Sequence, residues 1–357
     1  MEASLDWLAQ RVRDARDRRA PLRLRAGGTK DFYGNPTHGE LLDPRVHHGI
    51  VDYEPSELVV TARCGTPLSL LQSELDARGQ MLAFEPPHFG AGATIGGCVA
   101  AGLSGPRRAS AGAVRDFVLG AWLLDGRAQV LRFGGTVMKN VAGYDVARLL
   151  AGSLGTLGLI LQVSLKVLPK PPQEQTLQLP MGEAQALERL NLWAGRPLPI
   201  SATRWHNGVL TVRLSGAAST VGAAQRQLGG AWLAQEAAEC LWRDLREHDE
   251  DFFGGPEALW RFSLPSNAPP LQLGGDQLIE WGGALRWLRS SEPAAALRAR
   301  AEALGGNATL FRGGDRSSGA FAPLARPVAG IHRRLQDQFD PGRIFNPGRL
   351  VIDSHAN

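Results

Sequence analysis

Glycine recurs every third residue immediately before one of the most apolar segments of the chain. In "NVAGYDVARLLAGSLGTLGLI" (residues 140–160), Gly152, Gly155 and Gly158 separate a polar stretch from an apolar run. Glycine weakens helices and strands alike, because it loses more conformational freedom on folding than any other residue. Two explanations are open. Either the backbone needs conformations that other residues cannot adopt, or a large flat group lies against it.

Two further segments raise the same question. One is "RAGGTKDFYG" (25–34), which follows an expected strand, and the other is "GAGATIGGCVAAGLSGPRRASAGAVRD" (90–116). Successive backbone N–H groups in such loops can converge on an anion, and Arg25, Lys30 and the arginines at 107–108 add positive charge. Each loop alone could be an ordinary turn. The three together favour a long ligand with a central pyrophosphate and a flat ring at one end.

Spacing excludes two common nucleotide-binding loops. A Rossmann loop needs G-x-G-x-x-G, but in "GAGATIG" Ile95 occupies the third glycine position, and "GSLGTLG" is spaced G-x-x-G-x-x-G. A P-loop needs Gly-Lys followed by Ser or Thr, and that string does not occur in the sequence. Any phosphate would therefore be held by dispersed loops.

Length and composition predict a two-domain globular protein. A chain of 357 residues exceeds the size at which one core keeps growing. Its 39 basic and 35 acidic residues give a net charge of +4 without long charged blocks, which argues against a nucleic-acid partner. Cys64, Cys98 and Cys240 are too far apart to predict disulfides or an iron–sulfur site. With no signal peptide or membrane-spanning run in the sequence, we expect a cytoplasmic protein.

Periodicity predicts alternating helices and strands up to residue 169. The predicted elements are a helix over 4–19, strands over 22–25 and 57–62, a helix capped by Thr66, a hairpin over 117–133 and a strand over 159–169. Asp125-Gly126 is the expected hairpin turn, and the last strand is expected to have one polar face. The segment 90–116 shows little periodicity.

The proline-rich segment 169–175 is the expected domain boundary. We divide the chain into a first domain (1–170), a second domain (171–322) and a C-terminal tail (323–357) that returns to the first domain. The second domain combines a hairpin, "ISATRW" and "VLTVRL", with helices such as "EPAAALRARAEALGG", which predicts an α+β fold with an antiparallel sheet.

Seven of the nine tryptophans lie after residue 190. Tryptophans at such spacings usually belong to the core. For Trp281 and Trp287, within "IEWGGALRWL", an exposed sheet face or a partner surface is the alternative.

Several motifs resemble those of the vanillyl-alcohol oxidase, or PCMH-type, family of flavin-binding proteins. They include Pro86-Pro87, "ATIGG" (93–97), "AVRD" (113–116), the "GSLGTLG" string and the C-terminal "FDPGRIFNPGRL". The resemblance implies an α+β protein in which a PCMH-type FAD-binding domain of two α/β subdomains is joined to an α+β cap domain with an antiparallel sheet.

The resemblance also implies which residues lie along FAD. They are Arg25, Gly27, Gly28, Thr29, Lys30, Pro87, Thr94, Ile95, Gly96, Gly97, Gly102, Gly105, Asp116, Gly152, Ser153, Gly155, Thr156, Gly158, Ile160 and Asn346. Some members attach FAD covalently through a histidine in the first loop, where this chain has Gly28, Thr29 and Lys30. Noncovalent FAD is therefore expected, and Cys98 is expected to be a small buried residue.

Finer strings are similar to those of one group within the family, the FAD-binding accessory subunits of multi-subunit 2-hydroxy-acid (glycolate) oxidases. These strings include "FEPPHFG", "GPRRASAGAVRDFVLG" and "RFGGTVMKNVAGYD". The similarity implies two partners, a paralogous FAD-binding catalytic subunit and an iron–sulfur subunit. It also implies a small 2-hydroxy acid as the substrate of the complex, and peripheral contact with the inner membrane through that complex.

Whether this subunit carries out the chemistry is a separate question. Hydroxy-acid oxidation needs a cation for the carboxylate and a base for the hydroxyl proton. Catalytic relatives carry an H-x-G-D-G-N-x-H segment that this chain lacks. Its eight histidines form no metal-ligand pattern, and His47-His48 is expected to be a surface pair, so no metal site is predicted. Lys139, Tyr144 and Arg312 are the remaining candidates near substrate.

Three functional hypotheses follow. In the first, the subunit holds FAD as a redox centre of a 2-hydroxy-acid dehydrogenase complex. In the second, it is an assembly module whose flavin relays electrons or is structural, while its paralogous partner oxidises the substrate. The third is a free-standing flavoenzyme acting on another substrate.

Overall fold

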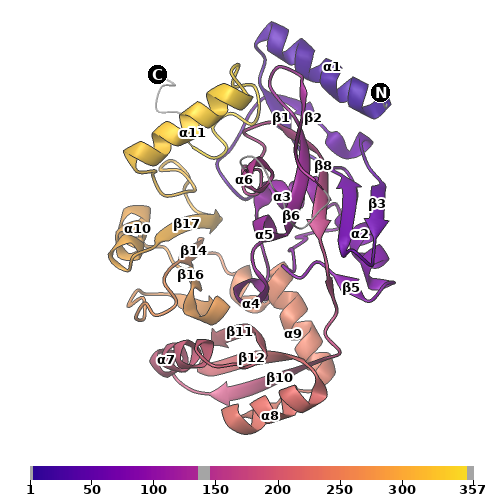
Figure 1. The fold of residues 1–357 in the computed structure, drawn as a ribbon. Helices are drawn as coiled ribbons and strands as arrows, with labels where there is room; N and C mark the ends of the chain where they lie inside the picture. Colours follow the sequence, from indigo (N-terminus) through magenta and orange to yellow (C-terminus); the bar gives the residue numbers. More distant parts are fainter. Residues whose placement is uncertain (1–2, 136–144, 352–357) are drawn as a thin grey trace. The chain divides into compact units, whose positions relative to one another are not determined.

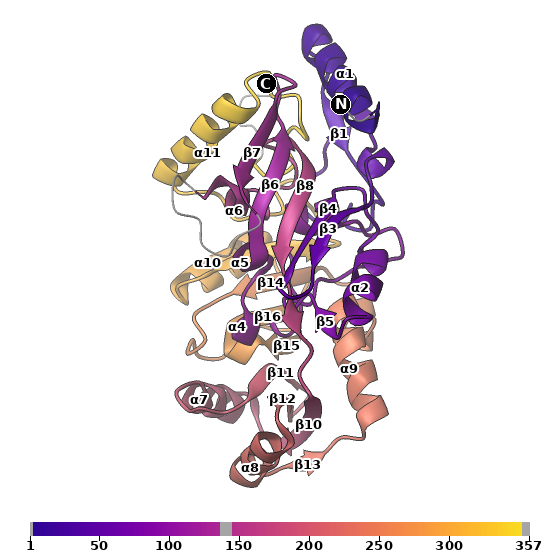
Figure 2. The same ribbon diagram turned by 45° about the vertical axis from the view of Figure 1, so that its right-hand side comes forward.

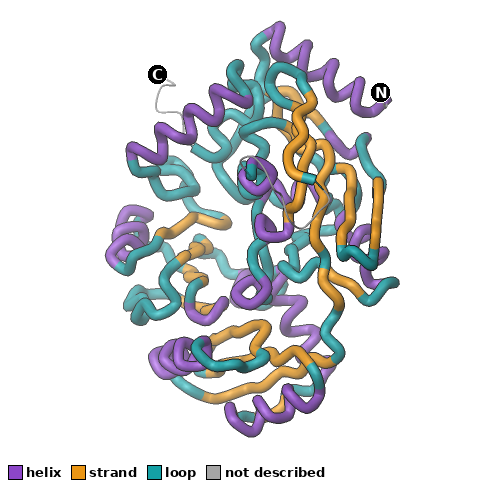
Figure 3. Tube along the Cα trace, in the orientation of Figure 1, coloured by secondary structure: helices purple, strands orange, loops and turns teal. Residues whose placement is uncertain are grey.

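The computed structural model describes residues 3–135 and 145–351 (Figures 1 and 3). The chain divides into two compact units. The first consists of Met1–Leu103, Ala113–Pro169 and Pro323–Asn357, and the second of Ser104–Gly112 and Lys170–Ala322. Ser104–Gly112 lies inside the first domain as we divided the sequence, but its contacts belong to the second unit.

A five-stranded antiparallel sheet forms the centre of the first unit, in the order β3-β4-β8-β6-β7 (Figure 2). Its strands are β3 (Ile50–Glu54), β4 (Val59–Arg63), β6 (Val118–Leu124), β7 (Val130–Gly134) and β8 (Leu159–Lys166). The packed helices are α3 (Ile95–Ala101), α5 (Val114–Phe117) and α6 (Val146–Leu149). The predicted hairpin is confirmed as β6 and β7, and the buried Asp125 carboxylate accepts from the N–H groups of Arg127 and Gln129 in its turn.

The N-terminal helix joins the chain ends in one core. Helix α1 (Ala3–Arg18) packs its leucine and valine side chains against the parallel pair β1 (Leu22–Leu24) and β2 (Glu40–Leu42) and against Phe345. Helix α11 (Arg326–Phe339) ends immediately before the sequence Asp-Pro-Gly, whose aspartate, Asp340, is its C-cap. Among the described helices, none has both the length and the apolar character needed to cross a membrane.

The second unit contains an eight-stranded antiparallel sheet, which confirms the predicted α+β cap fold. Its order is β13-β10-β12-β11-β15-β16-β14-β17. The strands are β10 (Gln173–Pro180), β11 (Ile200–His206), β12 (Val209–Gly216), β13 (Ala231–Trp232), β14 (Leu259–Ser263), β15 (Asp276–Glu280), β16 (Leu285–Arg289) and β17 (Asn307–Arg312).

Helices cover both faces of this sheet. Leu177 of β10 packs with α7 (Glu183–Ala194) and α8 (Ala218–Leu228), and α10 (Ala294–Ala303) packs over β14 and β16. Successive strand residues point to opposite faces. Thr176, beside Leu177, bonds instead to Trp242 of α9 (Gln235–Glu247), so α9 covers the other face.

The two tryptophans for which an exposed position was considered are core residues. Trp281 and Trp287 are 6% and 3% exposed. The indole N–H of Trp281 donates to the Gly105 carbonyl at 3.1 Å, and that of Trp287 donates to Glu280 at 2.7 Å. The exposed-face alternative is therefore wrong, because both rings are buried and both indole N–H groups are hydrogen-bonded within the second unit.

The segment 90–116 holds α3, α4 (Arg108–Ala111) and the start of α5, which are too short to give the sequence a helical periodicity. Two local expectations are wrong. Thr66 does not cap α2 (Leu68–Asp76), because its hydroxyl bonds to Gly49 and Arg63. The polar face of β8 is not fully exposed to solvent, because Ser164 is buried and its hydroxyl oxygen lies 2.8 Å from the Thr61 hydroxyl oxygen.

The histidine pair at 47–48 is likewise not a surface pair. His47 is buried and its Nδ1 lies 2.9 Å from the Ser4 hydroxyl, whereas His48 is exposed. The contact of His47 with Ser4 of α1 is a tertiary interaction, so no local pattern distinguishes the two histidines.

The end of α3 offers a test of backbone packing. Gly102 ends α3 with φ of +67°, and a Cβ at this position would lie 2.7 Å from the Gly152 Cα. We expect Gly102→Ala to lower the free energy of unfolding by about 2 kcal/mol or more, because it adds left-handed strain and a backbone clash. Urea unfolding checks this, with Gly182→Ala as the matched control, since that glycine has φ of −70° and open space around it. Equal stabilities for both variants would contradict the assignment.

Candidate functional site

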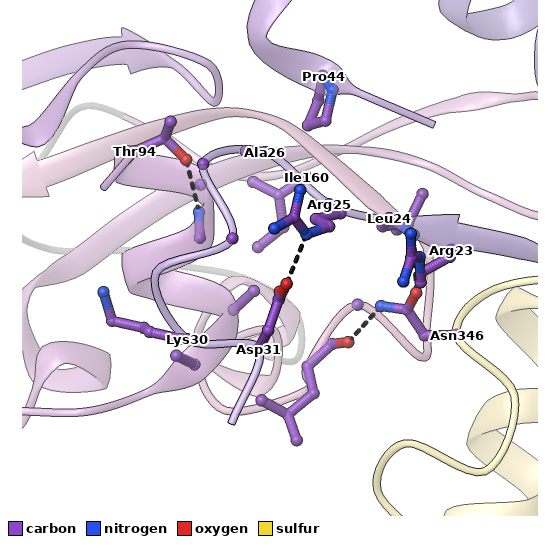
Figure 4. Close-up of a pocket in the computed structure, with 18 of the residues that line it drawn as sticks. Arg23, Leu24, Arg25, Ala26, Lys30, Asp31, Pro44, Thr94, Ile160 and Asn346 are labelled. Carbon is purple, nitrogen blue, oxygen red and sulfur yellow. Dashed lines mark hydrogen bonds and ion pairs between the residues drawn. The ribbon is translucent and has the colours of Figure 1, made fainter. Parts of the chain in front are cut away.

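A cavity of about 360 Å³ lies within the first unit (Figure 4). Its walls come from the end of β1 and the following glycine loop, the start of α3, the "GSLGTLG" turn with the start of β8, and the C-terminal segment. Twelve of the residues predicted to lie along a cofactor line it: Arg25, Gly27, Gly28, Thr29, Lys30, Thr94, Gly96, Gly97, Gly155, Gly158, Ile160 and Asn346. The tertiary structure thus brings the three glycine segments together.

The glycine loop after β1 contributes bare backbone. A side chain at Gly27 would clash with the carbonyl of Gly92, and Gly28 has φ of +69°. No acceptor among the described residues takes a hydrogen bond from the backbone N–H groups of residues 26–29. These donors, with glycine in the left-handed region, have the character of an anion-binding nest.

Two charged side chains frame this loop. The Arg25 guanidinium pairs with Asp31 at 2.5 Å. The Lys30 ammonium donates to the His88 carbonyl at 3.1 Å and lies 5.6 Å from the centre of the Phe89 ring. Lys30 therefore brings positive charge to the wall of the cavity while its position is fixed by the 88–89 backbone and ring.

The second wall is the start of α3. The Thr94 hydroxyl caps this helix by accepting from the Gly97 N–H at 3.3 Å (Figure 4). Gly96 has no room for a side chain, because a Cβ there would lie 2.6 Å from the Cys64 Cβ. Glycine at 96 therefore lets the helix approach the 64–65 turn, and it serves packing as well as lining the cavity.

Asn346 joins the remaining walls. Its side-chain oxygen accepts from the Leu24 N–H and its amide nitrogen donates to the Leu154 carbonyl, both at 2.7 Å (Figure 4). Its own N–H donates to the Leu22 carbonyl at 2.9 Å. Asn346 is 5% exposed. Its hydrogen bonds connect β1, the "GSLGTLG" turn and the C-terminal segment, which together form three walls of the cavity.

Eight predicted residues do not line the cavity: Pro87, Ile95, Gly102, Gly105, Asp116, Gly152, Ser153 and Thr156. Pro87 and Ile95 are buried. Gly102 and Gly152 pack against each other, and Gly105 belongs to the second unit, where it accepts the Trp281 bond.

The polar members of this group satisfy local backbone groups. The Asp116 carboxylate accepts from the Ala113 N–H at 2.8 Å, at the start of α5. The Thr156 hydroxyl donates to the Ser153 carbonyl at 2.8 Å. The Thr156 bond therefore closes the turn that carries the lining residues Leu154 and Gly155, whereas the Asp116 bond caps α5.

Of the three candidates for catalysis, the structure describes Arg312; Lys139 and Tyr144 lie outside the described residues. Arg312 belongs to the second unit, at the end of β17, where burial and the neighbouring Arg289 charge lower its pKa. The arginines at 107–108, expected to add charge near the glycine loops, also belong to the second unit, and Arg107 is paired with Glu174.

Some lining residues were missed from the sequence, among them Arg23, Thr37 and Arg349. Arg349 donates to the carbonyls of Asn35, Lys30 and Asp31, and so fixes the loop that follows the glycines. Strand alternation could have found Arg23, because it lies two residues before Arg25 in "LRLR". Thr37 and Arg349 carried no such signal.

Two buried cysteines lie in or beside the cavity wall. Cys64 lines it, and Cys98 is 1% exposed. Burial raises the pKa of Cys64 to about 12 and that of Cys98 to about 11. Both thiols therefore stay protonated near neutral pH and are poor nucleophiles, as expected of Cys98 as a small buried residue.

Comparison with known proteins identifies relatives of the whole chain. The model of a family described as an FAD binding domain matches residues 3–134. The glycolate oxidase subunit GlcE of Escherichia coli is 47% identical over 346 residues, which cover 97% of both chains. The glycolate oxidase subunit GlcD of Bacillus subtilis is 31% identical over 163 residues, which cover 45% of this chain and 34% of that protein.

A solved structure shares the fold. An alkyldihydroxyacetonephosphate synthase superposes with a TM-score of 0.67 at 15% identity, over 96% of this chain and 75% of the other. With the family match, this confirms the predicted PCMH-type flavin-binding fold with its α+β cap.

The Asn346 amide gives a first prediction for the site. Asn346→Asp removes the N–H donor to the Leu154 carbonyl and places a negative oxygen beside it. We expect unfolding free energy to fall by about 1–3 kcal/mol, the cost of unsatisfied buried polar groups. Urea unfolding measures it, and Asn207→Asp in the exposed β11–β12 turn is the control. If both variants unfold alike, Asn346 does not hold the cavity together.

The reactivity of the three thiols gives a second prediction for the site. At pH 8 we expect Cys240, which is partly exposed, to react with an aromatic disulfide reagent, while Cys64 and Cys98 react only after unfolding. The raised pKa of each buried thiol keeps it protonated and burial blocks access. The stoichiometry of released thiolate before and after denaturant checks this. Fast reaction of all three in the folded protein would show that the 64–98 region opens.

Proposed function

The chain belongs to the family of glycolate oxidase subunit GlcE, and on this premise we propose that it is the FAD-binding subunit of a multi-subunit enzyme that oxidises glycolate to glyoxylate. The observation that carries the proposal is the lined cavity of the first unit. There, glycine backbone from the 25–30 loop offers four N–H donors without a protein acceptor among the described residues.

The residues present fit a dinucleotide. The backbone of residues 26–29 would hold the pyrophosphate, since consecutive N–H groups beside a left-handed glycine suit an anion. Gly97 lines the cavity, and the atom nearest to a Cβ at this position would be the Thr94 hydroxyl oxygen at 3.3 Å, so the missing side chain leaves space in the wall. A Cβ at Gly27, Gly92 or Gly155 would meet protein atoms at 3.1 Å or less, so glycine at these positions lets the walls pack closely.

Bound FAD would supply the two-electron acceptor that oxidation of a hydroxy acid requires. The protein's own task is to hold and orient it. Lys30 keeps a positive charge at the cavity wall, and Asn346 and Arg349 fix the loops on either side of the cavity. Ile160 adds apolar surface at the start of β8.

We infer that FAD is held noncovalently. Gly28, Thr29 and Lys30 occupy the loop in which some flavoproteins of this fold carry an attaching histidine. The raised pKa of the Cys98 thiol, about 11, disfavours a cysteine linkage, because attachment needs a thiolate.

We infer that the subunit works with partners. A relative named glycolate oxidase subunit GlcE matches 97% of this chain, and one named glycolate oxidase subunit GlcD matches 45% of it. A paralogous FAD-binding subunit and an iron–sulfur subunit would complete the complex. The three cysteines of this chain are all free, and two of them are buried, so they do not provide cluster ligands.

Acid precipitation tests cofactor binding. We expect yellow protein whose acid supernatant contains intact FAD, identified by its absorption spectrum and chromatography, with a colourless pellet. Flavin retained in the pellet would contradict noncovalent binding. A folded, colourless preparation that cannot be reconstituted with FAD would contradict the proposed function itself.

Turnover separates the catalytic role from electron relay. Purified subunit is mixed with glycolate and an artificial acceptor, alone and with its partners. Turnover by the subunit alone would support a substrate-oxidising centre in this chain. Turnover only with the paralogous subunit would support a flavin that relays electrons or has a structural role.

A further inference from the structure

Arg23 lies in the cavity wall but outside every motif used to identify the site. It is the middle residue of β1 and lines the cavity together with Arg25. Arg25 directly follows β1, two residues after Arg23, and both side chains belong to the lining of the same cavity. Figure 4 shows both, with Arg23 beside Leu24 and Asn346.

The two arginines differ in their partners. Arg25 is neutralised by Asp31 at 2.5 Å. For Arg23, no hydrogen bond or ion pair to its guanidinium is found among the described residues; its Nε is buried, while the residue as a whole is partly exposed. Arg349, which also lines the cavity, donates hydrogen bonds to three backbone carbonyls. The wall therefore contains one guanidinium whose charge and donors are unused by the protein.

Such a group is costly without a ligand. A buried charged N–H that lacks an acceptor loses its hydration and receives no hydrogen bond in return. An anionic oxygen is its best partner, because hydrogen bonds between two charged groups are the strongest of their kind. The glycine loop at 26–29 begins three residues after Arg23, so in an extended chain the two backbone positions are about 10 Å apart. The long arginine side chain can extend across part of this distance toward a ligand bound at the loop.

We propose that Arg23 binds a phosphate oxygen of the dinucleotide held by the glycine loop, and so recognises its ADP part and not its flavin ring. The inference rests on the proposed FAD function and adds a specificity residue to that site. The loop supplies neutral N–H donors, and Arg23 supplies the unpaired positive charge. A ligand without phosphate gains nothing from it.

The test measures binding to the FAD-free full-length protein. Flavin fluorescence quenching gives the FAD dissociation constant, and competition gives that of ADP, for the wild type, Arg23→Met and Arg23→Lys. We expect Arg23→Met to weaken FAD and ADP about tenfold to a hundredfold, the range for a charged hydrogen bond. The affinity of Arg23→Lys for FAD and ADP should lie between those of the wild type and Arg23→Met, because lysine keeps the positive charge but lacks the planar set of donors.

Three further readouts separate ligand binding from a structural role. Riboflavin, which lacks phosphate, should bind Arg23→Met and wild type equally. Added salt should weaken FAD binding to the wild type more steeply than to Arg23→Met, because screening acts on the charge. The melting temperature of FAD-free Arg23→Met should be no lower than that of the wild type. Arg13→Met, at an exposed position of α1, is the control and should change none of these.

The outcomes are distinct. Unchanged FAD and ADP affinity in Arg23→Met, or equal losses for riboflavin, overturns the assignment of Arg23 while leaving FAD binding in place. A lower melting temperature of the FAD-free variant also overturns it, because Arg23 would then be structural. Failure of the wild type to bind FAD overturns the proposed function instead.

Discussion

The cavity depends on one buried amide. Asn346 bonds through its side chain to Leu24 and Leu154, which are 322 and 192 residues away in the sequence. Without it, the end of β1, the glycine turn before β8 and the C-terminal segment would each need another partner for a buried backbone group. Its left-handed backbone, with φ of +43°, is a conformation that asparagine tolerates better than most residues. This explains why an asparagine stands in the C-terminal motif.

Glycine serves two separate purposes in the first unit. At Gly96, Gly102 and Gly152 it permits contact between backbones or a left-handed turn, and these contacts bring α3 and the "GSLGTLG" turn together. In the 26–29 loop it leaves N–H donors at the cavity wall. Gly102 and Gly152 build the walls, whereas Gly27 and Gly96 both pack against neighbouring protein atoms and line the cavity. A glycine-rich sequence alone does not distinguish the two.

The second unit is organised by buried polar groups. Its sheet encloses Arg286, which donates to three backbone carbonyls, and Glu280, whose pKa burial raises to about 8 despite its bond from Trp287. The 104–112 segment completes this unit through Arg107, which pairs with Glu174, and through the Gly105 carbonyl. Trp281, Trp287, Arg107 and Arg286 are therefore core residues of this unit whose side-chain N–H groups find acceptors within it.

The sequence by itself determined the fold class, the long amphipathic helices, the β6–β7 hairpin and the segments that carry the glycine loops, because these follow from local periodicity, turn residues and motif strings. Twelve of the residues predicted to lie along the cofactor line one cavity, and Gly102, Gly152 and Thr156 lie in the turns around it. Only the tertiary structure decided that Arg23 is unpaired beside Arg25, that His47 is buried and that the arginines at 107–108 belong to the second unit. Pairing, burial and close backbone approach depend on residues far apart in the chain, and no local pattern carries that information.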